Sequence, residues 1–432
     1  MIAPISTRRH LLRAALAGAA AGLTAPWASL SIAARGVSAD NPRRFVFVIL
    51  RGGMDGLTAV PAVGDPGFAA ARGALAQFAG APLMLDTTFA LNPLLPQLHA
   101  MYGQGELAVV HATGLPYKER SHFDAQQVLE SGGSRPYELG TGWLGRALPG
   151  TALRAVALET AVPLVLRGPA AVDTWAPSVL PEPSADLVAR LEVLYRGDTE
   201  LALALARARG LREQMRDEMQ ADMRADMRAD MRADMRADRG EASGMAGGTT
   251  TGIANSAPNG QRNVPVLLAH KAAEFLQRGA QVAVLEMGGW DSHINQAQAN
   301  GALSNNLRTL DAVLAALRAG LQPGGAWGRT VVLVATEFGR EVAPNGTQGT
   351  DHGSGGAAFV LGGAVHGGRV LADWPGVAKA NRFEGRDLRT TTDLRAVMRS
   401  LLADHLHIAR AALDRSVLPG SAALPALELL RV

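Results

Sequence analysis

The chain has 432 residues, of which 47% are hydrophobic and 49 are glycine, so it is long enough to bury a large core and is rich in loops. It contains no cysteine, which excludes disulfide bonds, a thiolate nucleophile and any metal site with cysteine ligands. The formal net charge of +3 becomes nearly neutral without the four arginines of residues 1–39, so the composition predicts no nucleic-acid partner.

The first 39 residues have the pattern of an export signal. Arg8 and Arg9 precede an apolar run that starts at Ala14, and small residues follow it. At about 12 residues the run is too short for a transmembrane helix, which needs roughly 20. We therefore expect a twin-arginine signal peptide over 1–39, recognised by the twin-arginine export machinery, and a periplasmic or secreted mature chain over 40–432 without a transmembrane anchor. A short buried helix after a chance arginine pair is the alternative.

Four apolar segments with the composition of strands are each followed by polar side chains. These segments cover 45–50, 107–110, 282–285 and 331–334. They alternate with helical stretches, including one predicted over 264–278, which indicates an α/β fold with a doubly wound, mostly parallel sheet flanked by helices. Short strands predicted at 155–158 and 163–166 extend or cap this sheet. Ligands bind outside the carboxyl ends of such strands, so the residues just beyond them are expected to converge.

A helical, methionine-rich insertion is predicted over about 184–239, as one helix or as two separated near Gly210. It contains a four-residue repeat, Ala221-Asp222-Met223-Arg224, that recurs through Asp238. A period of four drifts against 3.6 residues per turn, so the methionines spiral around the helix and form no single buried face. We interpret the repeat as an expansion tolerated at the surface rather than as a methionine site for a metal or partner. Residues 240–263 are predicted to be a flexible linker.

The first polar motif places Asp55 directly after the first strand, between Gly53 and Gly56. Glycines let the backbone turn tightly and approach a ligand closely. A carboxylate there can hold a divalent cation, and the alternative is an N-cap of the next helix.

The second motif begins at Arg120 and starts an amphipathic stretch at Ser121. The hydroxyl of Ser121 would lie at a helix N-terminus, where free N–H groups stabilise phosphate or sulfate. Ser121 is therefore a candidate nucleophile, with an ordinary N-cap as the alternative. His122 is an adjacent candidate, and Lys118 and Arg120 could neutralise an anionic substrate.

The third and fourth strands are each followed by a carboxylate and histidine pair. Asp291 and His293 are two residues apart, and Glu337 ends the fourth strand before the pair Asp351 and His352. Either pair alone is weak evidence, because a surface loop would also accept it, but the pairs together predict a metal centre at the strand ends. Oxygen and imidazole donors suit zinc, manganese, iron or calcium.

These motifs closely resemble those of the bacterial domain-of-unknown-function family DUF1501, for which a twin-arginine signal is typical. The likeness covers nearly the whole chain outside the methionine repeat, and it rests on the segments 51–56, 120–126, 288–293, 336–340 and 350–353, with the glycines at 362–363 and 367–368 before Arg369. The family is placed beside sulfatases in the alkaline phosphatase-like superfamily, which implies a doubly wound sheet with metal at its strand ends. By this resemblance Asp55 is a metal carboxylate, Ser121 the nucleophile, Asp291 and His293 ligands of one metal, Glu337 a later carboxylate and His352 the last imidazole.

The chain also departs from that superfamily. Glu337-Phe338 stands where its phosphatases have Asp-His, and Asp291 and His293 are two residues apart rather than four. A second metal would lose an imidazole unless His122 or Asp351 replaces it.

The sequence thus predicts an exported, metal-dependent hydrolase of phosphate or sulfate esters, acting on a small anionic ester or a polysaccharide. Attack by Ser121 near a divalent metal is the expected chemistry. A sulfatase would need a formylglycine made in a particular motif that is missing around Ser121, which favours phosphate esters. The main alternative is a non-catalytic envelope protein that keeps the fold and binds a polysaccharide or a partner protein. A phosphomutase-like transferase is a weaker one.

Deletion of Ala221 to Asp238 tests the interpretation of the repeat. Because the removed helix has no continuous apolar face, the melting temperature and metal content are expected to stay within error of the parent protein. Thermal unfolding and elemental analysis check this, and loss of folding would show that the segment belongs to the core.

Overall fold

The computed structural model describes residues 43–149, 151, 153–177, 185–199, 201–203, 205–206, 209 and 264–431. The predicted signal peptide, the methionine repeat and the linker lie outside these residues. Within them, no helix combines the length and the apolar character needed to cross a membrane.

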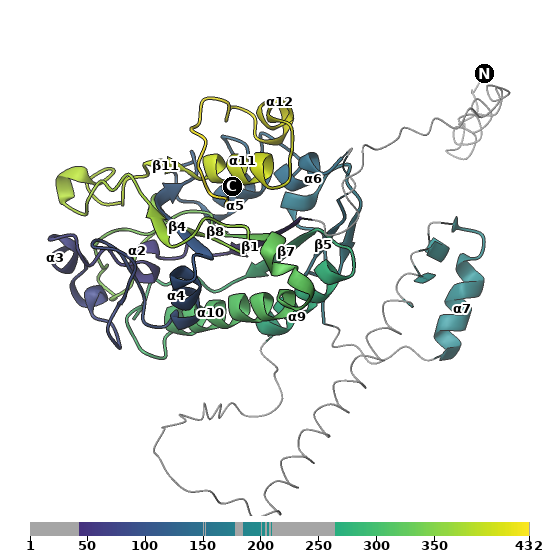
Figure 1. Ribbon diagram of the computed structural model, residues 1–432, viewed down its shortest axis with the longest axis horizontal. Coiled ribbons are helices and arrows are strands. Elements are labelled where there is room, and N and C mark those ends of the chain that lie inside the picture. Colours follow the sequence, from purple (N-terminus) through teal and green to yellow (C-terminus); the bar gives the residue numbers. More distant parts are fainter. Residues whose placement is uncertain are drawn as a thin grey trace, which may run out of the picture.

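A nine-stranded sheet forms the centre of the molecule (Figure 1). Its strand order is β10-β4-β9-β8-β1-β7-β5-β6, and β11 pairs with the end of β4. The strands are β1 Arg44–Leu50, β4 Leu107–Gly114, β5 Ala155–Ala157, β6 Val172–Thr174, β7 Val282–Met287, β8 Thr330–Thr336, β9 Gly356–Leu361, β10 Arg369–Leu371 and β11 Thr392–Asp393. A small separate hairpin joins β2 Leu83–Met84 and β3 Ala90–Leu91.

Strand β9 runs against the rest of the sheet. It pairs antiparallel with β8 and β4, whereas the other pairs of the described sheet are parallel. Its first residue, Gly356, lies opposite Thr113 near the carboxyl end of β4. The loop that precedes β9 therefore lies at the same edge of the sheet as the loops that come after the parallel strands.

Helices cover both faces of the sheet, which confirms the doubly wound, mostly parallel α/β fold (Figure 1). One face carries α4 Pro96–Gly103, α9 Val264–Gln277 and α10 Ala302–Leu321, and the other carries α5 His122–Ser131, α6 Trp143–Ala147 and α11 Leu394–Asp404. Side chains of β1 alternate between the two layers: Val46, Val48 and Leu50 pack into one, and Phe45, Phe47 and Ile49 into the other. A central strand buried on both faces accounts for the continuous apolar runs in the sequence.

Short helical segments complete the described chain. They are α2 Gly56–Ala59, α3 Phe68–Arg72, α7 Ala185–Tyr195, α12 Arg410–Ala412, a π-helical turn at Leu413–Val417 and 3-10 turns at Gly73–Ala76, Leu164–Leu166, Pro323–Gly325, Trp327–Arg329 and Lys379–Asn381. Helix α7 lies at the start of the predicted insertion.

One short strand prediction was wrong. Residues 163–166 form a 3-10 turn, in which the N–H groups of Leu166 and Arg167 donate to the carbonyls of Pro163 and Leu164. Val165 and Leu166 are buried in the same apolar layer as α6, so the run is apolar because of burial and not because it pairs in the sheet. Apolar composition alone does not separate these two cases.

Candidate metal centre

Three histidines and one aspartate meet at the carboxyl edge of the sheet. We call this set the histidine cluster; it consists of His122 at the start of α5, Asp291 and His293 after β7, and His352 in the loop before β9. Between 23% and 43% of each side chain is exposed, so the cluster is open to solvent.

The Nε2 atoms of the cluster converge on the carboxylate of Asp291. Oδ1 lies 3.0 Å from Nε2 of His293 and 3.2 Å from Nε2 of His352, and Oδ2 lies 3.4 Å from Nε2 of His122. The Nε2 atoms of His293 and His352 are themselves 3.0 Å apart. Nε2 of His122 is buried and has no hydrogen-bond partner.

The other ring nitrogen of each histidine is held by an acceptor. Nδ1 of His122 lies 2.9 Å from Oε1 of Glu337, Nδ1 of His293 lies 3.0 Å from Oδ1 of Asp351, and Nδ1 of His352 lies 3.0 Å from the carbonyl oxygen of Arg120. Because a carboxylate and a carbonyl only accept, a neutral ring in each place carries its proton on Nδ1. Each Nε2 then presents a lone pair to the others and to Asp291.

Lone pairs and a carboxylate that face one another repel unless a cation lies among them. A metal ion, or additional protons on the rings, would remove this repulsion. Histidine ligands of metals commonly donate their second N–H to a carboxylate or a backbone carbonyl, as these three do. A tetrahedral zinc ion with bonds of about 2.0–2.1 Å places neighbouring ligand atoms roughly 3.3 Å apart. The distances of 3.0 and 3.2 Å from Oδ1 of Asp291 to Nε2 of His293 and His352 are close to this value.

Arg340 contacts the carboxylate of Asp291 and the backbone of the surrounding loops. Its guanidinium is fully buried and donates to Oδ1 of Asp291 at 2.5 Å and to the carbonyls of Gly52, Gly53, Trp290 and Thr350. Although burial by itself raises the pKa of Asp291, the hydrogen bond and charge of Arg340 and the charge of His293 lower it to about 2. Asp291 is therefore ionised at neutral pH.

Glu337 and Asp351 contact the Nδ1 atoms of His122 and His293 and do not lie among the Nε2 atoms. Oε1 of Glu337 accepts from the backbone N–H of Gly52 at 2.8 Å and from Gln126 at 3.0 Å, in addition to His122. Burial raises the pKa of Glu337, but the hydrogen bonds from His122 and Gln126 outweigh it and the pKa is lowered. The hydrogen bond to Glu337 in turn raises the pKa of His122. Asp351 accepts from Asn345 at 3.0 Å, the main cause of its lowered pKa.

The conformations of two glycines permit this close packing. Gly52 has φ +120°, and a Cβ there would lie 2.6 Å from the backbone nitrogen of Asp291. Gly53 has φ +67°, and a Cβ there would lie 2.5 Å from the ring of Phe338. Phe338 packs against the rings of His122 and His352 at centroid distances of 4.8 Å.

Asp55 lies outside the cluster, in a buried network of its own. Its carboxylate caps α2 by accepting from the N–H groups of Leu57 and Thr58, and it pairs with the buried guanidinium of Arg72 at 2.5 Å. Gln296 donates to the same carboxylate and, at 3.0 Å, to the hydroxyl of Thr58. Burial would raise the pKa of Asp55, but the charge and hydrogen bond of Arg72 lower it. The cationic partner of Asp55 in this structure is thus an arginine.

The predicted nucleophile is the N-cap of α5. Oγ of Ser121 accepts from the N–H of Asp124 at 3.5 Å, which fits the cap alternative. The guanidinium of Arg120 pairs with Asp387 and Glu384, and the ammonium of Lys118 donates to the carbonyl of Leu115 and to Thr390. Both basic side chains named for substrate binding therefore already have partners.

Sequence reasoning gave no role to three side chains that shape the site: Arg340, Gln126 and Gln296. Gln126 stands four residues after His122, so the two lie on one face of α5 and reach the same carboxylate. This four-residue spacing could have indicated from the sequence that Gln126 lies beside His122. Arg340 and Gln296 act through contacts between distant segments, for which the spacing of residues in the chain gives no signal.

The family match agrees with the motifs that build this edge of the sheet. A family model described as "Protein of unknown function (DUF1501)" matches residues 50–409. The chain belongs to this DUF1501 family. A comparison with curated proteins gave no match.

Several solved structures resemble the DUF1501 chain distantly. A sulfatase from Pseudoalteromonas sp. is 13% identical with a TM-score of 0.36, over 83% of this chain and 67% of that one. The C-terminal periplasmic domain of EcEptC from Escherichia coli in complex with Zn is 10% identical with a TM-score of 0.40, over 90% and 89%. A phosphonate monoester hydrolase of Agrobacterium radiobacter is 11% identical with a TM-score of 0.35, over 85% and 74%. The likeness concerns the fold class alone, a mostly parallel sheet flanked by helices.

The pair of Asp55 and Arg72 makes a testable contribution to stability. Arg72→Met leaves a buried carboxylate without its partner, so it should lower the free energy of unfolding by about 3–5 kcal/mol, whereas the double variant with Asp55→Asn should recover much of this. Chemical denaturation measures both. Because the pKa of Asp55 is lowered on folding from the ordinary 3.8, its contribution is present above that pH and lost below it, so the difference between wild type and Arg72→Met should narrow in acid. Equal losses in the single and double variants would contradict the pairing.

Proposed function

We propose that the chain is a metal-dependent hydrolase of phosphate or sulfate esters whose ion is held by the histidine cluster. The observation that supports this most strongly is the orientation of the three imidazoles: each Nδ1 is held by an acceptor, and each Nε2 lies near the carboxylate of Asp291. Ligand atoms of His122, Asp291 and His352 lie within 4.8 Å of one another. A metal ion among these nitrogens and the carboxylate would satisfy all of them at one point.

The donor set indicates which ion fits. Imidazole nitrogens with one carboxylate suit zinc, iron or manganese, whereas calcium prefers a shell of oxygen atoms. Asp291, His122, His293 and His352 would hold the ion, and Glu337 and Asp351, proposed from the sequence as ligands, would instead fix the rings. When bound, the ion would supply Lewis acidity at the ester and lower the pKa of a coordinated hydroxyl or water.

The chain's own residues set up the rest of the reaction. Arg340 keeps Asp291 ionised, and Glu337 and Asp351 keep the protons of His122 and His293 on Nδ1. The cluster is partly exposed to solvent, and the N-terminus of α5 adds N–H groups suited to phosphate or sulfate. Ser121 stands at that N-terminus and is the proposed nucleophile.

The proposal also includes a substrate class and a location in the cell. A small anionic ester or a polysaccharide is the proposed substrate, which a bound ion at the exposed sheet edge would attract. Export through the twin-arginine pathway to the periplasm or the medium is supported by the arginine pair and apolar run in residues 1–39.

A non-catalytic binding protein is the second candidate, and two observations favour it. Asp55 is saturated by Arg72, Thr58 and Gln296, and Phe338 fills space against two of the histidines. One ion in the cluster could then hold an anionic ligand without turnover.

Removal of cluster residues tests the metal centre. Asp291→Ala and His352→Ala should each lower bound metal, and a chelator should lower the melting temperature of the wild type but not of these variants, because metal binding is linked to folding. Elemental analysis and thermal unfolding provide the measurements. The matched control is His366→Ala, which removes an exposed histidine in the loop before β10. Unchanged metal content in both cluster variants would rule out the cluster as the metal site.

Three substitutions at one position separate a nucleophile from a helix cap. Ser121→Asn keeps a capping oxygen and removes the hydroxyl, so it should lower turnover of aryl phosphates or sulfates on the order of a thousandfold at unchanged stability and metal content. Ser121→Thr keeps hydroxyl and cap and should retain more activity. Ser121→Ala should add a loss of about 1 kcal/mol in stability. Activity close to wild type in Ser121→Asn would leave Ser121 as a cap only.

A further inference from the structure

Gln296 connects the buried Asp55 network to the loops that carry the histidine cluster. It lies beyond β7, its side chain is buried, and its amide is bonded on both sides. The Nε2 group donates to Asp55 and to Thr58, and Oε1 accepts from the hydroxyl of Ser292 at 3.0 Å and from that of Thr350 at 2.7 Å.

The two hydroxyl partners stand next to cluster residues. Ser292 lies between Asp291 and His293, and Thr350 lies two residues before His352. The same two segments are paired through the backbone, since the N–H of Thr350 donates to the carbonyl of Ser292 at 3.2 Å. The orientation of Asp291 and His293 relative to His352 therefore depends on how this pair of loops is fixed.

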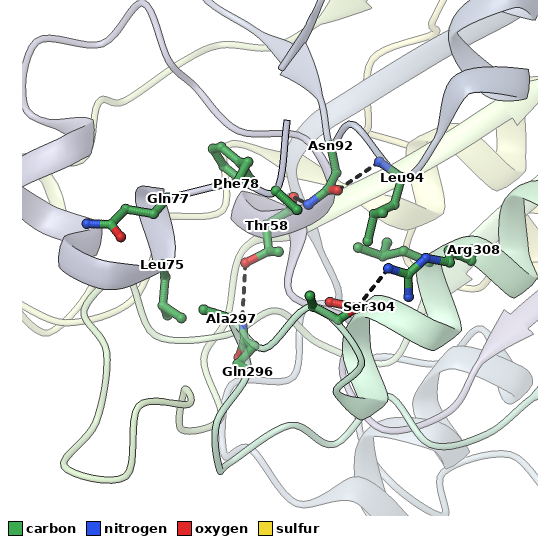
Figure 2. A pocket seen from close by; sticks show the side chains of 13 residues that line it. Thr58, Leu75, Gln77, Phe78, Asn92, Leu94, Gln296, Ala297, Ser304 and Arg308 are labelled. Carbon is green, nitrogen blue, oxygen red and sulfur yellow. Dashed lines mark hydrogen bonds between the residues drawn. The ribbon is translucent and has the colours of Figure 1, made fainter. Parts of the chain in front are cut away.

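The amide nitrogen of Gln296 is bonded to Asp55 and Thr58, which are themselves held in place. Asp55 is held by Arg72 and by the first turn of α2, which comes after β1 in the centre of the sheet. A small hollow borders this anchor, and Gln296 and Thr58 meet at its wall (Figure 2). Four side-chain hydrogen bonds, two from the amide nitrogen and two to the amide oxygen, fix the position of Gln296.

We propose that Gln296 is a positioning residue of the metal centre, which sets the relative placement of Asp291, His293 and His352 through Ser292 and Thr350. This inference rests on the proposed metal-dependent function, because it concerns the same centre. The amide of Gln296 points its Nε2 group toward the anionic Asp55 and its Oε1 atom toward the two hydroxyls. We propose that this orientation sets the geometry of the metal ligands.

Another buried amide in the same hollow supplies the matched control. Asn92 lies opposite Gln296 in Figure 2; its side chain donates to the carbonyl of Thr58 and accepts from the N–H of Leu94. It touches neither of the two loops through a side-chain hydrogen bond. A substitution there removes a buried amide of similar chemistry without a direct connection to the cluster.

The test is zinc affinity, measured by calorimetry on the metal-free full chain, together with the free energy of unfolding in the presence of chelator. Gln296→Leu should weaken zinc binding by up to roughly tenfold, because direct partners of metal ligands contribute about 10–100-fold and Gln296 acts one step further out, through Ser292 and Thr350. Asn92→Leu should lower stability and leave the zinc dissociation constant within about twofold of wild type. If Gln296 served only the fold, Gln296→Leu would behave like Asn92→Leu: it would lower the free energy of unfolding and leave zinc affinity nearly unchanged.

Variants that remove a single hydrogen bond to Gln296 can test the inference if Gln296→Leu does not fold. Thr350→Val and Ser292→Ala each remove one bond to Oε1, and each should weaken zinc binding less than Gln296→Leu. In combination with Gln296→Leu they should add little, because the bond is already lost. Zinc affinity that is equal in Gln296→Leu and Asn92→Leu, or unchanged in Thr350→Val and Ser292→Ala, would overturn the inference. A wild-type chain that binds no zinc, manganese or iron would overturn the metal centre itself.

Discussion

One buried guanidinium holds the candidate site together. Arg340 lies near the start of the loop that joins β8 to β9. Its donors reach the carbonyls of the loop after β1, of the loop after β7 and of Thr350 further along its own loop, as well as Asp291. Arginine suits this position because its planar group directs several N–H donors at fixed angles and stays charged when buried. Without it, several buried carbonyls would lose their partners and the loops that bear the ligands would lose their common anchor.

The carboxylates at the sheet edge differ in role because they differ in partners. Asp291 faces the three Nε2 atoms, Glu337 and Asp351 face Nδ1 atoms, and Asp55 faces Arg72. All four come after strands or precede β9 in the same crevice, so position alone makes them equivalent. The roles differ because each carboxylate meets a different basic group, and only Asp291 of these four faces the Nε2 atoms of the cluster.

The sequence predicted the fold class and the gathering of polar residues, for a physical reason. Apolar runs such as 45–50 and 331–334 are strands buried on both faces, and the polar loops beyond their carboxyl ends meet in one crevice. The reversed direction of β9 left no mark in the sequence, because a strand buried on both faces has the same pattern in either direction. The pairing of Asp55 with Arg72 was equally hidden, since it depends on how α3 returns to α2. Ser121 as an N-cap was visible as an alternative because capping is a local property.

The strand order also determines when the sheet can form during synthesis. In the described chain β1 pairs with β7 and β8, and β4 pairs with β9, β10 and β11, so neither has a partner strand before Val282. A growing chain that has passed β6 therefore carries two long apolar strands without their neighbours, and such unpaired edges are prone to aggregate. Long-range pairing of this kind is slow. The centre that joins His122 to His352 can consequently assemble only late in synthesis, once β7, β8 and β9 have left the ribosome and the two waiting strands have found their partners.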